Sequence, residues 1–306
     1  MRRLASALLA VAISCAITAA HSQAPLPPRA TAAPAISPTP IRSPATFVYA
    51  GELIQGGWLK GSVPGGTIAL TLDGAPVDIA PDGRFLVAFD RDSGPAATLV
   101  ARLSDGRSIS AALTVAPRAW QIENVSVDPR PAALPSAEYE RRRAIELARI
   151  KAARAIVNAT QGWRQDFMWP VFGRISGRFG AQRIYRGIPG SYHSGIDIAR
   201  GTNGGGSGSP YVAPADGVVI LAAEAPFTLE GNLLMIDHGN GLSSAFLHSS
   251  RLLVKAGDVV HRGQAIGLIG MTGRATGPHL HWSLKWREAR LDPILFTGAM
   301  PAKGRN

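Results

Sequence analysis

Between residues 47 and 115, short apolar runs alternate with polar positions and are separated by turn-forming residues. A period of two places every second side chain on the same face of a strand. Asp73-Gly74 and Asp105-Gly106 are typical of tight hairpins, and Pro81-Asp82-Gly83 marks another turn. We predict a small antiparallel β-sandwich over residues 46–117, with strands at Phe47–Leu53, Trp58–Val63, Thr67–Leu72, Arg84–Phe89, Ala97–Leu103 and Ile109–Val115.

The hydrophobic period becomes helical between Ser136 and Ala159. Acidic residues concentrate near the start and basic residues toward the end, which suits the helix dipole. Pro135 stands before the start and Gly162 beyond the end. The pattern predicts a helix within a linker of residues 118–165. A solvated connecting helix is favoured over one that binds nucleic acid or membrane.

Residues 166–302 carry many short apolar runs punctuated by glycine. Asn240-Gly241 is a strong hairpin signal that joins a strand at about Leu233–Asp237 to one at Leu242–His248. Glycine at this density suggests compact turns and close backbone approach. We therefore expect an antiparallel sheet folded over a groove. The fold class predicted for the whole chain is mainly β.

The N-terminus has the pattern of a secretory signal. Arg2 and Arg3 precede an apolar run that reaches about Ala20, so we predict a signal peptide over residues 1–22 and export to the periplasm or cell envelope. An uncleaved anchor and a lipoprotein cleavage at Cys15 are the alternatives. Cleavage after the run would remove the one cysteine, so the exported fold would need no disulfide, and we expect no stable membrane span after it.

Residues 23–45 form a separate compositional segment, with seven prolines between Pro25 and Pro44. Such a segment favours an extended, semi-rigid tether over a packed fold.

The net charge of +11 over 306 residues favours anionic surroundings. Basic residues are dispersed along the chain, without a nucleic-acid motif or a basic stretch interleaved with aromatic residues, so nucleic acid is not expected as a partner. The length leaves room for two modest domains with cores of their own.

Six of the seven histidines lie between residues 193 and 281. If the segment from Pro278 to Leu284 is a strand, His279 and His281 leave the same face with Cα atoms roughly 6.5 Å apart. His193 and Asp197 add a ring nitrogen and a carboxylate oxygen. Together with one histidine of the pair they make three ligands, which leaves a position open for water as in a catalytic zinc site.

Each motif alone is a weak signal, because a lone HxH is usually a strand with polar outer positions and a lone HxxxD occurs by chance. Their combination is more specific. Gly195 within the first motif and Thr276-Gly277-Pro278 before the second indicate tight backbone turns and disfavour surface helices.

The segment from Trp169 to about Pro301 resembles the catalytic domain of the lysostaphin-type zinc endopeptidases, which cut the peptide bridges of peptidoglycan. Residues 46–117 resemble the β-rich N-terminal module of some members. The ordered motifs that carry the resemblance are Trp169-Pro170-Val171, Gly177-Arg178-Phe179-Gly180, His193–Asp197, Ala213–Gly217, Ile236–Gly241, Arg262-Gly263-Gln264 and Gly270–Trp282.

The resemblance implies one Zn²⁺ per chain, bound by His193, Asp197 and His281 on the floor of the groove. It implies catalytic roles for His248 and His279. We assign His279 to water activation and His248 to oxyanion stabilisation or proton donation, as a hypothesis.

Other positions near these motifs have simpler interpretations. His238 precedes a hairpin turn and is expected to be structural or at the rim, and His261 to lie at the surface. Phe246 stands where the family often has tyrosine, which keeps the ring for packing and loses a hydroxyl. Arg200–Ser209, rich in glycine, and Arg183–Tyr192 are expected to form rims of the groove.

The sequence therefore predicts an exported zinc metallo-endopeptidase that acts on peptidoglycan cross-links or stem peptides. Two alternatives stay open: a non-catalytic wall-binding activator of another hydrolase, and a zinc peptidase that acts on proteins. The bond cleaved, the role of the N-terminal module and the oligomeric state are open as well.

Overall fold

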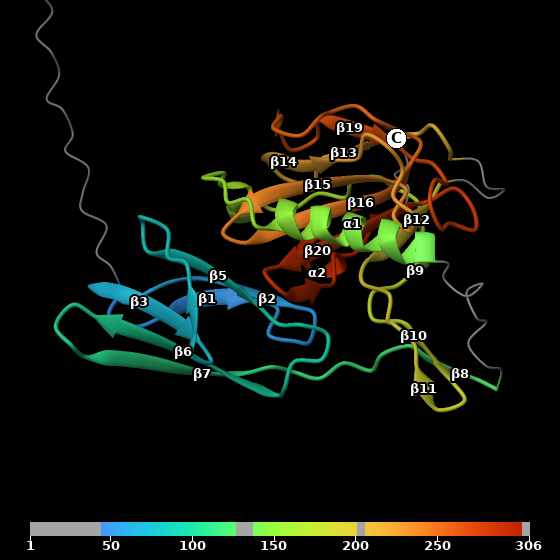
Figure 1. The fold of residues 1–306 in the computed structure, drawn as a ribbon. Helices are drawn as coiled ribbons and strands as arrows, with labels where there is room; N and C mark the ends of the chain where they lie inside the picture. Colours follow the sequence, from blue (N-terminus) through green and yellow to red (C-terminus); the bar gives the residue numbers. More distant parts are fainter. Residues whose placement is uncertain (1–43, 127–136, 201–205, 302–306) are drawn as a thin grey trace, which may run out of the picture. The chain divides into compact units, whose positions relative to one another are not determined.

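The computed structural model describes residues 44–126, 137–200 and 206–301, and most of its regular elements are antiparallel β-strands (Figure 1). This confirms the mainly β fold class. The predicted signal peptide, residues 23–43 of the tether and residues 201–205 of the glycine-rich segment lie outside the described residues. Contacts divide the chain into residues 1–41 and residues 42–306, and every element below belongs to the second unit. The finer domain boundaries stay a prediction.

The N-terminal part forms two antiparallel sheets, as the alternating pattern predicted. A three-stranded sheet has the order β1-β2-β5 and a four-stranded sheet the order β4-β3-β6-β7. The bounds are β1 Val48–Gly51, β2 Trp58–Ser62, β3 Thr67–Leu72, β4 Ala75–Val77, β5 Arg84–Ala88, β6 Ala96–Leu103 and β7 Ser108–Thr114.

Only β4 was missed, because it is three residues long and contains Pro76, which cannot donate to a ladder. The turn before it was predicted. Asp73 and Gly74 both have positive φ, 49° and 83°, as a tight primed hairpin turn requires. The inner faces of the two sheets share a core in which Leu59, Phe85 and Leu99 are fully buried.

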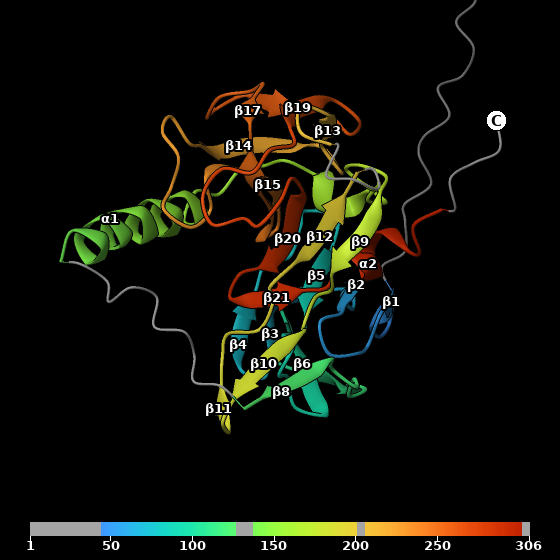
Figure 2. The same ribbon diagram turned by 90° about the vertical axis from the view of Figure 1, so that its right-hand side faces the viewer.

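The C-terminal part is built on a larger sheet with the order β18-β14-β15-β16-β20-β12-β9, and β21 pairs with β20. The bounds are β9 Arg174–Gly177, β12 Ile196–Ala199, β14 Gly217–Ala222, β15 Asn232–Gly239, β16 Leu242–Ser249, β18 Val259–Val260, β20 Leu280–Trp286 and β21 Ala289–Leu291. The predicted Asn240-Gly241 hairpin joins β15 to β16. Figure 2 shows β20, β12 and β9 side by side.

Two three-stranded sheets flank the larger one. The first, β13-β19-β17, comprises β13 Pro210–Val212, β17 Arg251–Leu252 and β19 Ala265–Leu268. The second, β11-β10-β8, comprises β8 Ile122–Val125, β10 Gln182–Tyr185 and β11 Ile188–Pro189. In the second sheet, β8 pairs with β10 in parallel. A segment predicted as linker thus contributes a strand that pairs with β10, which precedes the His193–Asp197 (HSGID) motif in the chain.

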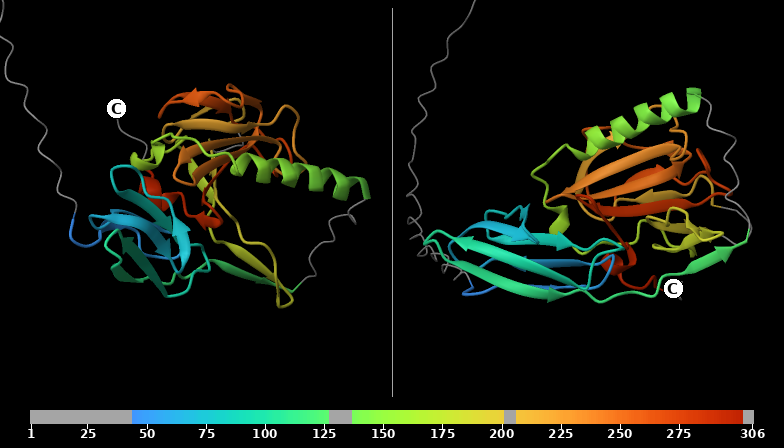
Figure 3. Two further views of the ribbon diagram at one scale, coloured as in Figure 1. Left: turned by 60° about the vertical axis from the view of Figure 1, so that its left-hand side comes forward. Right: turned by 60° about the horizontal axis from the view of Figure 1, so that its bottom comes forward.

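The connecting helix α1 spans Ala137–Arg154 and ends five residues before the predicted end. Figure 3 shows it lying across strands of the larger sheet. It is more than a solvated connector, because Glu146 is buried and accepts hydrogen bonds from Thr228, and Arg143 forms an ion pair with Glu230. The short helices are η1, Gly162–Arg164, and α2, Ile294–Thr297. Among the described residues no helix is long and apolar enough to span a bilayer.

Side chains join the N-terminal sheets to the larger sheet. Trp58 donates from Nε1 to the Leu295 carbonyl at 2.9 Å, and its ring packs on Phe296. Arg118 forms a 2.8 Å ion pair with Asp292, whose side chain is almost completely buried. These contacts therefore fix β2 and the segment that holds Arg118 against the segment of Asp292 and α2.

Arg91 is a further joining residue, and only 6% of it is exposed. It donates to the Gly180 carbonyl at 3.2 Å and to Gln182 Oε1 at 2.9 Å. Its guanidinium lies over the rings of Trp120 and Tyr192. A loop of the N-terminal part thus supports the segment that leads into His193.

We expect Arg91→Ala to lower the free energy of unfolding by about 2–3 kcal/mol, because a buried carbonyl loses its donor and two rings lose their packing partner. Chemical denaturation measures the change. Arg84→Ala is the control, since its side chain is 59% exposed and its contact with Asp82 is 3.9 Å long, and it should cost less than about 0.5 kcal/mol. Equal effects of the two substitutions would contradict the assignment.

Candidate metal centre

The pairing of β12 with β20 sets Asp197 directly opposite His281. Ile196 and Ile198, on either side of the aspartate, are fully buried, so Asp197 faces away from the core. His193 lies in the segment before β12, which is held by two backbone hydrogen bonds, from Gly180 N to His193 O and from His193 N to Ala181 O. These features bring His281 close to His193 and Asp197, which lie 88 and 84 positions before it in the sequence.

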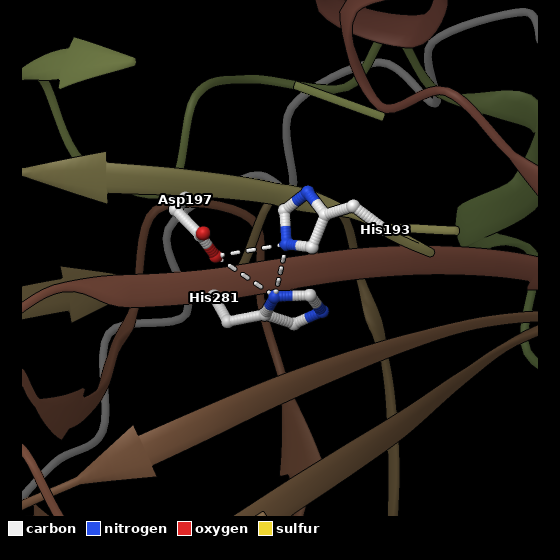
Figure 4. Close-up of side chains that lie close together, drawn as sticks. All are labelled: His193, Asp197 and His281. Carbon is white, nitrogen blue, oxygen red and sulfur yellow. Dashed lines mark hydrogen bonds and ion pairs between the residues drawn. The ribbon is translucent and has the colours of Figure 1, made fainter. Parts of the chain in front are cut away.

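Three donor atoms converge there, as Figure 4 shows. Asp197 Oδ1 is 3.1 Å from His193 Nε2 and 2.9 Å from His281 Nδ1, and the two ring nitrogens are 3.0 Å apart. Ligand atoms on a tetrahedral zinc ion at 2.0–2.1 Å lie about 3.3 Å from one another. Two imidazole nitrogens and one carboxylate oxygen at this spacing fit a zinc ion, while their binding of metal stays a prediction.

The outer nitrogen of His193 fixes how its ring is presented. Nδ1 lies 3.0 Å from the Arg178 carbonyl, which can only accept, so Nδ1 carries the proton and Nε2 offers its lone pair inward. A hydrogen bond from the outer ring nitrogen to a carbonyl orients histidine ligands in metal sites in this way.

Charge within the trio is balanced by the carboxylate. Burial opposes ionisation of Asp197, but the close polar contacts of its carboxylate with the His193 and His281 rings outweigh burial and hold its pKa far below the usual range. Burial likewise opposes the charged form of His193, yet the bond to Asp197 raises its pKa. Burial dominates at His281 and lowers its pKa. Asp197 is therefore anionic at neutral pH, as a metal ligand must be.

Two glycines make room for the side chains of the trio. A Cβ on Gly195 would lie 2.4 Å from the Trp282 carbonyl and 2.8 Å from His281 Nε2. A Cβ on Gly177 would lie 2.3 Å from Asp197 Oδ2. All three distances are shorter than packing allows, so Gly195 and Gly177 are needed for the backbone to approach the side chains of His281 and Asp197.

The structure places His248 and His279 beside the trio. Their ring centroids are 4.9 Å apart, and the centroid of His248 is 6.3 Å from that of His281. His279 Nε2 lies 3.6 Å from Asp197 Oδ1. Strand β20 begins at Leu280, so His279 sits just before it, where it bridges to Gly270.

Both rings are anchored through Nδ1. His248 donates to the Thr272 carbonyl at 2.8 Å and His279 to the Gly277 carbonyl at 2.8 Å. In each neutral ring, Nε2 is therefore an acceptor. The oxyanion-stabilising or proton-donating role assigned to His248 consequently requires its ring to gain a proton first. Burial lowers the pKa of His248 to about 4, so the ring starts neutral at pH 7.

His248 also has an unusual backbone conformation. Its φ is 66°, in the left-handed region where residues other than glycine are uncommon. Its N–H donates to the Glu230 carbonyl at 2.9 Å, and Arg143 of α1 holds the Glu230 side chain. Strained residues of this kind cluster at functional sites.

The remaining positions singled out in the sequence lie elsewhere. His238 is fully buried, with Nδ1 2.8 Å from the Asp216 carbonyl and Nε2 2.7 Å from Ser244 Oγ, which fits a structural role and excludes a place at the rim. His261 is exposed. Phe246 is fully buried in line with the rings of Tyr211 and Trp282, so this position packs the core and does not face a substrate.

A groove of about 810 Å³ opens beside His193 and Asp197. Its lining includes Arg183, Tyr185 and Tyr192 of the predicted rim segment. It also includes residues for which the sequence predicted no role of their own at the site: Gln121, Glu123, Arg178 and Arg274. The first two belong to the segment around β8, where the apolar residues Ile122 and Val125 are three positions apart, so that no strict alternation indicates a strand.

Comparison with known proteins agrees with this arrangement. The sequence profile of peptidase family M23 matches residues 191–293. Over 134 residues the chain is 40% identical to peptidoglycan DD-endopeptidase ShyA of Vibrio cholerae. This alignment covers 42% of this chain and 28% of ShyA. Over 128 residues it is 36% identical to DD-carboxypeptidase/endopeptidase Mpg of Neisseria meningitidis. This alignment covers 40% of this chain and 27% of Mpg. The aligned region thus spans less than a third of either relative.

A solved structure extends the similarity to most of the chain. An M23 peptidase structure from Pseudomonas aeruginosa superposes with a TM-score of 0.61 at 30% identity, covering 80% of this chain and 95% of that one. This chain belongs to peptidase family M23, the lysostaphin-type family. The resemblance seen in the motifs is thereby confirmed, and with it the metallopeptidase class at the level of the family.

Burial lowers the pKa of His238 from 6.5 to about 4. Between these two values the unfolded chain binds more protons than the folded chain, so stability should fall as the pH drops through this window, by up to about 1.4 kcal/mol per pH unit from this one group.

His238→Gln keeps a donor and an acceptor but does not titrate. Its stability deficit relative to the unsubstituted protein, measured by urea denaturation in chelator, should shrink from pH 7 to pH 4.5. A deficit that stays constant across this range would show that His238 is not buried in the neutral form.

Proposed function

We propose that this chain is an exported zinc metallo-endopeptidase that hydrolyses peptide bonds in peptidoglycan. The observation that carries the proposal is the convergence of His193 Nε2, Asp197 Oδ1 and His281 Nδ1 within 3.1 Å of one another, beside a groove. The name of ShyA, a peptidoglycan DD-endopeptidase, supports peptidoglycan as the substrate. The apolar segment after Arg2 and Arg3 supports export to the periplasm or cell envelope.

The donor set suits zinc better than a harder cation. Two imidazoles and one carboxylate make a mixed nitrogen and oxygen set, whereas Mg²⁺ and Ca²⁺ prefer oxygen ligands alone. Bound there, zinc would lower the pKa of a water and polarise a peptide carbonyl. We therefore infer one zinc per chain, with these three residues as its ligands.

His279 and His248 supply the proton transfers in this proposal. His279 bonds to the Gly277 carbonyl through Nδ1, so its Nε2, 3.6 Å from Asp197 Oδ1, is placed to accept a proton beside the ligands. His248 Nε2 is an acceptor as well, and a ring that gains a proton can donate it to the oxyanion or to the leaving amine. The carbonyls of Thr272 and Gly277 hold both rings in orientation while this happens.

Digestion of purified peptidoglycan by the protein without its signal segment, with and without chelator, tests the proposal. We expect new amino termini in the released fragments, loss of release with chelator and recovery with zinc. An inert wall together with stoichiometric zinc would favour a wall-binding activator. Cleavage of an unfolded protein but not of peptidoglycan would favour a protein-directed peptidase.

Substitution of the ligand His281 and of the catalytic histidines should affect zinc content and activity differently. His281→Ala should lose both zinc and activity, because a donor atom is removed. His248→Ala and His279→Ala should retain zinc while activity falls by about 100- to 10,000-fold, the usual contribution of general acid–base catalysis. Zinc content by elemental analysis and fragment release from peptidoglycan report the two effects.

His261→Ala is the matched control, since its side chain is 75% exposed and it should change neither quantity. Full activity in His248→Ala would remove that residue from the mechanism. Retention of zinc at unchanged affinity in His281→Ala would remove His281 from the ligand set.

A further inference from the structure

The groove beside the metal ligands carries more positive than negative charge. Among the described residues that line it are three arginines, Arg178, Arg183 and Arg274, and two carboxylates, Glu123 and Asp197. Asp197 is taken up by His193 and His281. The lining away from the ligands therefore holds three guanidinium groups and one carboxylate.

Only one of these arginines has an acidic partner. Arg183 Nε lies 2.7 Å from Glu123 Oε2, across the parallel pairing of β10 with β8. Within residues 44–126, 137–200 and 206–301, the guanidinium groups of Arg178 and Arg274 have no hydrogen bond or ion pair, and both residues are exposed. Two cations thus face the groove without an internal counter-charge.

The backbone places these two arginines beside two different histidines. The Arg178 carbonyl accepts the hydrogen bond that orients His193. Arg274 lies two residues after Thr272, and the Thr272 carbonyl orients His248. The backbone N–H of Arg274 donates to the Leu229 carbonyl at 3.0 Å. The segments that set the ring orientations also carry the two unpaired charges, and both arginines line the same groove as His193 and Asp197.

We propose that Arg178 and Arg274 bind a free carboxylate of the peptide substrate next to the scissile bond, and so determine which peptides are cut. This rests on the proposed function, because stem peptides of peptidoglycan retain carboxylates that are not part of any peptide bond. Guanidinium groups bind carboxylates through paired, charge-assisted hydrogen bonds. Amidation of such a carboxylate removes its charge and one acceptor, and it is the change that these arginines discriminate against.

The test uses a synthetic cross-linked stem-peptide dimer and matched dimers in which each free carboxylate is amidated in turn. For the unsubstituted, zinc-loaded protein we expect amidation of one carboxylate to lower kcat/KM by about 10- to 100-fold. Arg178→Gln and Arg274→Gln should cleave the free-acid dimer about 10- to 100-fold more slowly. Both variants should cleave the amidated dimer at nearly the rate at which the unsubstituted protein cleaves it. The preference for the free-acid dimer then disappears.

Arg251→Gln is the control, because Arg251 is exposed on β17 and does not line the groove. It removes the same charge and should keep the full preference. Zinc content and thermal stability should be unchanged in all three variants, since Arg178 contacts His193 and Arg274 contacts Leu229 only through backbone atoms that glutamine retains.

The outcomes distinguish this inference from the proposed function. Equal cleavage of free-acid and amidated dimers by the unsubstituted protein, or an unchanged preference in both arginine variants, overturns the carboxylate site and leaves the peptidase intact. Failure to cleave any dimer, together with an inert purified wall, overturns the proposed function and the inference with it.

Discussion

The candidate centre depends on the register between β12 and β20. Asp197 stands opposite His281 only because the neighbours of each residue, Ile196 and Ile198 on one strand and Leu280 and Trp282 on the other, are fully buried. A slip of one residue would turn isoleucine toward the groove and aspartate into the core, at a prohibitive cost in free energy. The hydrophobic core thus fixes two of the three donor atoms before any metal arrives, and the hydrogen-bonded segment before β12 brings the third.

Histidine takes on different roles in this fold because the environments differ. His238, closed in by a carbonyl and a hydroxyl, is a neutral structural residue. His193, His248 and His279 each donate Nδ1–H to a backbone carbonyl and present Nε2, whereas His281 turns Nδ1 toward Asp197. The carbonyls that orient these rings belong to glycine-rich segments without regular structure. Those segments also carry the unpaired arginines of the groove, which links orientation of the site to recognition of a charged substrate.

Much of this was predictable from the sequence, because the signals are local. Period-two alternation and the Asn240-Gly241 turn placed the strands, and the spacing of the HSGID and HxH motifs indicated a ligand set. The residues alone did not decide between His279 and His281, since that depends on pairing between strands more than 80 residues apart. The parallel strand β8, the positive φ of His248 and the contacts of α1 were missed for the same reason. They arise from tertiary packing, which leaves no local period.

In the proposed site, three side chains that are set by one strand register share a single zinc ion. Anomalous diffraction at the zinc edge from crystals of the zinc-loaded protein tests it most directly. We predict one ion bound to His193 Nε2, Asp197 Oδ1 and His281 Nδ1, with His248 and His279 outside its ligand shell. An ion bound by His248 or His279 in place of His281, or no ordered ion at these three side chains, would contradict the account.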